Sequence, residues 1–330
     1  MDWSGILEDG LRSALGLLAA VYALSAIGIN LQFGYTGLVN YGQAGFLLVG
    51  AYGTAIAVDR WDWPLWVAFL VGMAAAVLLG LVLGIPTLRL RADYLAIVTI
   101  SAAEILRITA NSRAAQDVTG GPQGIKGIAG DFFDLNPFTG RFTLFGDVAY
   151  SARNLWVITV TWSLVVVISV LLYLLVRSPW GRVLKAIRED EDAARALGKN
   201  VFAFKMQSLV IGGVIGGIAG VMLAIDRQFV EPRNFESSIT FLAYAALILG
   251  GVARILGPIL GSMILWFFIV ASQSFLTEAI ENGFLGIDGL VTRDDVGPVR
   301  FMLVGLLIML LVIFRPQGIL GDRREVMLGE

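Results

Sequence analysis

Long runs without any Asp, Glu, Lys or Arg alternate with short charged segments along this chain. Seven runs stand out, at residues 13–58, 63–88, 154–176, 206–225, 237–253, 255–277 and 301–314. A charge at the centre of a membrane-spanning helix costs about 2.5–3.5 kcal/mol on insertion scales, so runs of this length indicate membrane crossings. The first run has 46 residues and holds two crossings, because one crossing takes about 20 residues.

The pattern predicts an all-α, polytopic integral membrane protein with about nine spanning helices, eight and ten being the limits. Residues 94–109 form a weaker span, because Glu104 and Arg107 lie near one end. No low-complexity linker divides the chain, so residues 1–330 are expected to form a single transmembrane domain.

Composition supports a membrane protein and narrows its chemistry. Hydrophobic residues make up 57% of the chain and charged residues 15%, where about 25% charged is usual in soluble proteins. The mean hydropathy is +0.79. There is no Cys and no His, which excludes disulfides, thiolate nucleophiles, His-based triads and zinc sites with Cys or His ligands. We therefore expect transport or scaffolding, no catalytic residues and no metal site.

Charge also decides orientation and excludes one class of partner. A net charge of −2 offers no basic field for nucleic acid. Seven of the 24 basic residues lie within residues 177–205, and three more lie near the C-terminus. Lys and Arg concentrate in cytoplasmic loops, so both segments, and the C-terminus, are expected in the cytoplasm. Residues 110–153, a Gly- and Pro-bearing ordered loop or cap, and residues 278–300 then lie outside.

The N-terminus predicts a retained helix over residues 11–31. It carries Asp2, Glu8 and Asp9 where a signal peptide has a basic region, and it shows no clear small-residue cleavage site.

Residues 33–53 combine paired glycines with polar side chains at membrane depth. Only residues 45–58 would remain as an uninterrupted apolar helix, which is short for a crossing. Irregular backbone is tolerated in a membrane where it is buried or lines a cavity, so a discontinuous element that borders a pathway is favoured. The candidate pathway residues are Asn40, Tyr41, Gly42, Gln43 and Gly45. The alternative is a smooth helix whose glycines allow close packing.

Residues 206–225 carry two neighbouring rows of glycines, each row with a spacing of four residues. The glycines concerned are Gly212, Gly213, Gly216, Gly217 and Gly220. Such a face lets another helix approach to backbone contact. Internal helix packing is the favoured interpretation, and a subunit interface is the alternative.

Glu104 and Arg107 stand three residues apart on one helix face. They can pair and so reduce the cost of lying near the membrane interface. A proton relay is the alternative, but no His and no second carboxylate lies nearby in the sequence.

Residues 180–198 are too charged to cross a membrane, yet their apolar residues recur at three- and four-residue steps. This spacing predicts an amphipathic helix. A helix lying on a membrane normally has a uniformly basic polar face, whereas residues 189–192 are four consecutive acids. We therefore favour a cytoplasmic helix that docks in a cleft of another protein. The candidate docking residues are Arg182, Ala186, Arg188, Glu189, Asp192, Ala193, Ala194 and Gly198.

The end of this segment is similar to the EAA-x-x-x-G loop of bacterial ABC importer permeases, with Asp192 in place of the Glu. The longer string AIREDEDAARALGKNV resembles the LivM-type permeases of branched-chain amino acid importers. So do five other strings, in the same order over nearly the whole chain: NLQFGYTGLVNYGQAGFLLVGAY, LRLRADYLAIVTISAAEILR, TGGPQGI, LGGVARILGPILG and FRPQGILG. One departure is Gln43, where relatives often carry His, and it bears on the substrate.

The resemblance implies a bacterial inner-membrane permease that passes branched-chain or related hydrophobic amino acids. The implied partners are a LivH-type permease, two cytoplasmic ATPase subunits that bind ATP and Mg²⁺, and an extracytoplasmic binding protein. The chain contains no GxxxxGK[ST] phosphate loop, so it is not expected to be the ATPase. The alternatives are an ABC permease for urea or short amides, a secondary transporter driven by an ion gradient, and a membrane enzyme.

Overall fold

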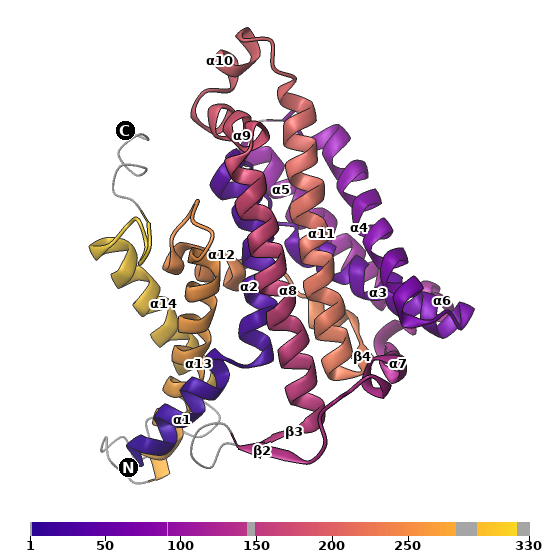
Figure 1. The fold of residues 1–330 in the computed structure, drawn as a ribbon, viewed down its shortest axis with the longest axis vertical. Coiled ribbons are helices and arrows are strands. Elements are labelled where there is room, and N and C mark those ends of the chain that lie inside the picture. The colour runs from indigo at the N-terminus through magenta and orange to yellow at the C-terminus, as the bar shows by residue number, and fades with distance from the viewer. Residues whose placement is uncertain (1, 91, 144–148, 282–295, 322–330) are drawn as a thin grey trace.

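The computed structural model describes residues 2–90, 92–143, 149–281 and 296–321, and it shows a bundle of helices (Figure 1). The all-α architecture is confirmed. The four strands have two or three residues each and form two small antiparallel pairs at one end of the bundle.

Seven helical segments in the described part of the chain are long and apolar enough to cross a membrane. They are α2 (Leu17–Ile29) with the π-helix η1 (Asn30–Tyr35), α4 (Leu65–Thr87), α5 (Ala92–Asn111), α8 (Ala152–Arg177), α11 (Val201–Arg227), α13 (Gly257–Glu281) and α14 (Val296–Phe314). Two shorter or less apolar helices, α3 (Gln43–Trp61) and α12 (Ser238–Gly250), pack among them. The described residues thus hold seven segments that meet the length and apolarity of a crossing, against about nine expected, and α3 and α12 account for the difference.

Burial divides the bundle into an inner and an outer layer. In α2 with η1 and in α11, 89% and 78% of the most apolar 18-residue window is buried, so these two helices form the centre. The corresponding figure for α14 is 11%. The apolar side chains of α14 therefore face lipid or another subunit.

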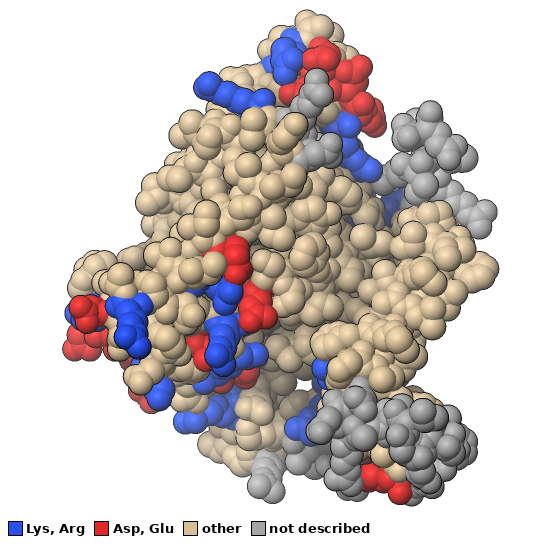
Figure 2. Space-filling view, turned by 180° about the vertical axis from the view of Figure 1, so that it is seen from behind, with Lys and Arg blue, Asp and Glu red and all other residues tan. Residues whose placement is uncertain are grey.

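Charged side chains gather at the two ends of the molecule. Figure 2 shows a broad band without charges between a charged end and the region of the loops at the opposite end. The charged end in Figure 1 carries α9 (Pro179–Glu189) and α10 (Glu191–Ala196). The uncharged band is the part that a bilayer would cover.

The helix α12 is short, and its C-terminus is capped by a distant segment. With 13 residues and a rise of 1.5 Å per residue, it spans only about 20 Å of a hydrocarbon core of about 30 Å. The backbone N–H groups of Ile319 and Leu320 donate to the carbonyls of Leu249 and Gly250, each at 3.0 Å. Carbonyls that a helix C-terminus leaves open are thus satisfied by the segment that follows α14.

The single helix expected over residues 11–31 is wrong. The chain forms α1 (Trp3–Ala14) and then α2, with Gly16 in extended backbone between them. A Cβ added at Gly16 would lie 3.0 Å from the carbonyl oxygen of Arg12, so a side chain would crowd this turn. The helix α1 packs against α13.

Residues 110–153 are ordered wherever the structure describes them. They contain η2 (Arg113–Ala115), α6 (Gln116–Thr119), η3 (Gly121–Gln123), β1 (Ile125–Lys126), α7 (Gly130–Asp134), β2 (Arg141–Thr143) and β3 (Ala149–Ser151). The strand β1 pairs with β4 (Phe229–Val230), which follows α11 and precedes η4 (Pro232–Phe235). The indole Nε1 of Trp156 in α8 also donates to the carbonyl of Phe132, at 3.0 Å. The loop is therefore fixed to the bundle at several points.

The glycines of α11 lie against other helices of the same chain. A Cβ added to any of Gly212, Gly213, Gly216, Gly217 and Gly220 would meet atoms of α2, η1, α3 or α4 within 3.4 Å. A Cβ added to Gly50 of α3 would lie 2.5 Å from the Cα of Gly217. At this crossing α3 and α11 approach each other to backbone contact.

Candidate functional site

The discontinuous element expected near residue 40 is present. The π-helix η1 ends at Tyr35, residues 37–42 are not helical, and α3 starts at Gln43. Gly37 has φ +73°, a left-handed conformation that favours glycine. The helix α3 begins two residues before the apolar stretch expected over residues 45–58 and runs to Trp61. We call residues 37–42 the break.

Side chains of other helices satisfy the backbone of the break. The N–H of Tyr41 donates to Oγ1 of Thr99 in α5, at 3.1 Å, and the N–H of Ala44 donates to Oγ1 of Thr240 in α12, at 2.9 Å. The hydroxyl of Tyr244 in α12 donates to the carbonyl of Asn40, at 2.9 Å. Within a membrane, backbone N–H and C=O groups that are not bonded in a helix find no water to bond with. The bonds to these side chains therefore allow the helix to end before residue 37.

The polar side chains of Asn40 in the break and of Gln43 at the start of α3 point inward. Asn40 and Gln43 are fully buried. Nδ2 of Asn40 donates to Oε1 of Gln32 at 2.9 Å, and Nε2 of Gln43 donates to the carbonyl of Gly212 at 3.1 Å. Gly42 and Gly45 are buried as well. The structure thus brings the predicted pathway residues together, with four of the five held inside the bundle.

Tyr41 is the member of this group that reaches the surface. Its ring is half-buried, and its centroid lies 4.9 Å from that of Tyr244 and 5.7 Å from that of Phe241. Phe241, on α12, is 51% exposed. The break therefore presents a neutral aromatic surface, with the amides of Asn40 and Gln43 behind it.

The docking segment consists of two helices, whereas the sequence predicts one over residues 180–198. Asp190 interrupts it, because one of its carboxylate oxygens, Oδ1, accepts the backbone N–H groups of Asp192 and Ala193, each at 2.9 Å, and starts α10 as an N-cap. Gly198 follows α10 with φ +78°, which explains a glycine at this position.

The faces of α9 and α10 are clearly divided. Leu184 and Ile187 of α9 and Ala194 of α10 are buried against the bundle. The other candidate docking residues, Arg182, Ala186, Arg188, Glu189, Asp192, Ala193 and Gly198, are exposed. Leu197 is 78% exposed, an apolar side chain at the tip of the molecule. A partner would meet the exposed face and not Ala194.

A hydrogen bond joins the docking segment to the last turn of η1. Nη1 of Arg188 donates to the carbonyl of Gly34 in η1, at 2.5 Å. The Nζ of Lys185 also lies 5.8 Å from the centroid of the Tyr35 ring. Both contacts fall on the last turn of η1, directly before the break.

Comparison with known proteins adds the family. A family described as the permease component of branched-chain amino acid transport systems matches residues 12–313. The chain belongs to this family. It is 31% identical over 320 residues to the high-affinity branched-chain amino acid transport permease LivM of Escherichia coli K12, covering 94% of this chain and 70% of that one. LivM of Salmonella typhimurium is 32% identical with the same coverage, and LivH of that species is 25% identical with 94% of each chain covered.

For this permease, several residues that build the break were not expected. Three of them, Thr99, Thr240 and Tyr244, come from helices that are distant in the sequence. The fourth, Gln32, lies in the charge-free run 13–58, which predicts a membrane crossing but not the contacts of a single polar side chain. A signal was present in α12, because Thr240 and Tyr244 stand four residues apart on one face of an otherwise apolar helix.

The pairing expected between Glu104 and Arg107 is present. Nε of Arg107 donates to Oε2 of Glu104 at 3.0 Å, and Nη2 donates to Oε1 at 2.5 Å. The bidentate geometry favours the structural pair over the proton relay.

Proposed function

We propose that this permease is the LivM-type subunit of an ATP-driven importer that carries branched-chain or related hydrophobic amino acids across a bacterial inner membrane. It works with a LivH-type permease, two cytoplasmic ATPase subunits that bind ATP and Mg²⁺, and an extracytoplasmic binding protein. This chain itself binds no cofactor, and its C-terminus lies in the cytoplasm. The observation that carries the proposal is the Arg188 bond to the Gly34 carbonyl, which connects an exposed docking surface to the turn of η1 directly before the break.

In this mechanism the ATPases act on the break through α9 and α10. The exposed face of these helices receives an ATPase subunit, with Leu197 as an apolar anchor. Movement of α9 carries Arg188 and pulls on the last turn of η1. Because residues 37–42 do not form a regular helix, they absorb the displacement more readily than a continuous helix would.

The surface at the break suits an apolar zwitterion in transit. Tyr41 and Phe241 offer aromatic faces to a hydrophobic side chain. Neither ring carries a charge that would hold the substrate's ammonium or carboxylate group. Weak binding allows release, and tight binding belongs to the extracytoplasmic binding protein.

Uptake by the reconstituted transporter tests the proposal. The permease, its LivH-type partner, the ATPases and the binding protein are placed in proteoliposomes with radiolabelled leucine. We expect uptake that requires ATP and persists after proton and sodium gradients are collapsed. Uptake driven by an imposed ion gradient without ATP would refute the proposal in favour of a secondary transporter. Uptake of urea or a short amide in preference to leucine would refute the assignment of hydrophobic amino acids as the substrate.

Thiol labelling tests the pathway separately, since the chain has no Cys of its own. Phe241→Cys is expected to react with a small water-soluble reagent, at a rate that changes during turnover. Leu171→Cys is a matched control, because the two native side chains are 51% and 59% exposed and Leu171 lies on the apolar helix α8, six residues before its end at Arg177. Equal reactivity at the two positions would contradict a water-accessible path beside Tyr41.

A further inference from the structure

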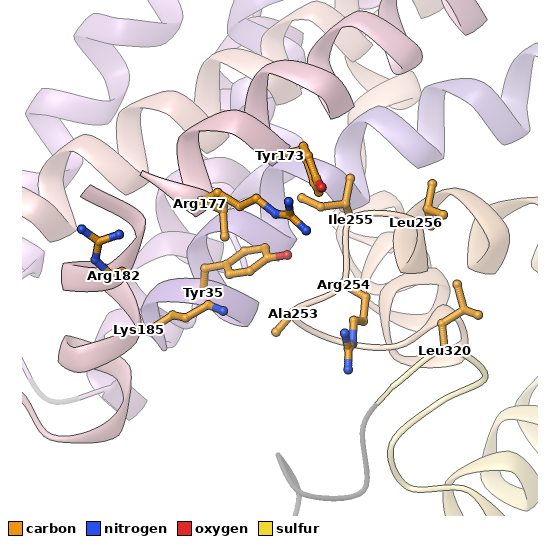
Figure 3. A pocket seen from close by; sticks show the side chains of 11 residues that line it. Tyr35, Tyr173, Arg177, Arg182, Lys185, Ala253, Arg254, Ile255, Leu256 and Leu320 are labelled. Carbon is orange, nitrogen blue, oxygen red and sulfur yellow. The ribbon is translucent and has the colours of Figure 1, made fainter. Parts of the chain in front are cut away.

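A cavity of about 600 Å³ lies at the end of the bundle that carries the docking helices. Its walls come from η1, the end of α8, the start of α9, the connection from α12 to α13, and the segment after α14. Figure 3 shows Tyr35 and Arg177 projecting into the space that faces Ala253 and Arg254, with Lys185 beside the Tyr35 ring. Arg182 stands at the edge, nearer the start of α9 than Lys185.

The described residues that line this cavity include four basic side chains and no acidic one. The basic residues are Arg177, Arg182, Lys185 and Arg254. Aromatic rings position two of them, since the guanidinium of Arg177 lies 4.2 Å from the centroid of Tyr173 and the ammonium of Lys185 lies near Tyr35. A cation over a ring is held in place while its charge is retained. Positive charges gathered in this way favour an anion as their ligand.

An apolar track leads from the cavity along the bundle. At the rim Tyr173 is 40% exposed, Leu256 59% and Leu320 38%. The outward face of α8 continues it with Leu174, Leu171, Val170 and Val167, each more than half exposed. These residues recur at three- and four-residue steps, so they form one stripe on the helix, running from the cavity into the uncharged band.

We propose that the cavity binds the phosphodiester headgroup of an anionic phospholipid, with its acyl chains along the exposed stripe of α8. Arg177 and Lys185 supply charge-assisted hydrogen bonds to the phosphate oxygens. The apolar stripe distinguishes a lipid from a soluble anion, which has no acyl chain to place there. Basic pockets between spanning helices on the cytoplasmic side commonly bind such headgroups.

The position of the site gives the lipid a role in coupling. Lys185 belongs to α9, Arg177 to α8, and Tyr35 to the last turn of η1. A headgroup held by Arg177 and Lys185 would therefore bridge the docking helix and the bundle, at the turn that Arg188 also contacts. This inference rests on the proposed function only for the orientation of the protein, with the docking helices in the cytoplasm. It does not depend on which substrate is carried.

Lipid retention by the purified complete transporter tests the inference. The transporter is placed in nanodiscs of zwitterionic lipid with graded phosphatidylglycerol, and the lipids that remain bound are identified by native mass spectrometry. We expect preferential retention of phosphatidylglycerol by the wild type. The double variant Arg177→Gln/Lys185→Gln is expected to weaken this binding about 30-fold, the factor for two juxtamembrane cations.

The matched control is Arg89→Gln/Lys199→Gln, which removes two exposed basic residues outside the cavity lining. It is expected to retain the lipid as the wild type does, and elution of every variant as an intact complex checks assembly. Equal lipid loss in both double variants, or retention of zwitterionic lipid to the same extent, would overturn the inference. A titration with inorganic phosphate separates the sources of the anion: displacement of the bound lipid by millimolar phosphate would assign the cavity to a soluble anion instead.

Discussion

Replacement of Gly50 by alanine tests the backbone contact between α3 and α11. The added Cβ would lie 2.5 Å from the Cα of Gly217 and 2.6 Å from its carbonyl oxygen. Ordinary contact begins at 3.4 Å, so 3.4 Å less 2.5 Å leaves a deficit of 0.9 Å. Both obstructing atoms belong to the backbone, so no side-chain rotation can remove the clash.

The helices must therefore separate, and the neighbouring helix α4 opposes this. A Cβ on Gly53 would lie 2.9 Å from the Cα of Gly72, so α3 is close to α4 as well. Overpacking of a filled core costs about 1–3 kcal/mol. We expect Gly50→Ala to fall at or above the upper end of that range, because a shift of whole helices disturbs many contacts at once.

Gly305→Ala is the matched control. Gly305 lies within the spanning helix α14, and a Cβ there would meet no atom of the described residues within 4 Å. Alanine is favoured over glycine in a helix by about 1 kcal/mol, so this variant should be as stable as the wild type or more stable.

The assay is the temperature at which half of the detergent-solubilised protein is lost from the monodisperse gel-filtration peak, followed with a fluorescent fusion. Gly50→Ala is expected to lower this midpoint and Gly305→Ala to leave it unchanged or raise it. If Gly50→Ala has the same midpoint temperature as the wild type, the close approach of α3 and α11 does not constrain the fold. A similar drop in both variants would also contradict the reasoning, since only one position has a clash.

Three further predictions concern the break and the docking segment. Asp190→Ala removes the N-cap of α10 and should destabilise that helix by about 1 kcal/mol; hydrogen exchange would rise across residues 191–196, and Asp190→Asn should restore protection. Leu197→Asp should reduce co-purification of the ATPases and uptake while the permease still inserts and folds, because Leu197 makes little contact within its own chain; normal co-purification would exclude it as an anchor. Tyr244→Phe leaves the Asn40 carbonyl without its 2.9 Å donor and should cost about 1–3 kcal/mol, seen as a lower unfolding midpoint, whereas Tyr41→Phe should not change that midpoint.

Much of the fold could be predicted from where charges are missing. The cost of a charge in lipid acts on each segment by itself, so the runs at residues 63–88 and 154–176 give α4 and α8 nearly to the residue. The break was also foreseeable, because polar groups in residues 36–43 have no place in a lipid-facing helix.

The partners that hold the break could not be predicted in the same way. The N–H of Ala44 bonds to Thr240, 196 residues away, and the carbonyl of Asn40 bonds to Tyr244, 204 residues away. Such pairings depend on how helices pack, which the periodicity of one segment does not contain. The division at Asp190 depends on local contacts instead, because the Asp190 side chain caps α10 two and three residues later in the sequence. The regular apolar spacing of residues 180–198 predicted one continuous helix, so this cap was missed.

The capping of α12 has a consequence for biosynthesis. The carbonyls of Leu249 and Gly250 accept hydrogen bonds from the N–H groups of Ile319 and Leu320. During translation these donors are added 70 residues after their acceptors. Until those residues emerge, the two carbonyls lack the donors that close the end of α12, and unsatisfied buried carbonyls are costly. This part of the bundle therefore closes only after α13 and α14 have been synthesised, and a nascent chain stalled before residue 319 carries these two carbonyls without their native donors.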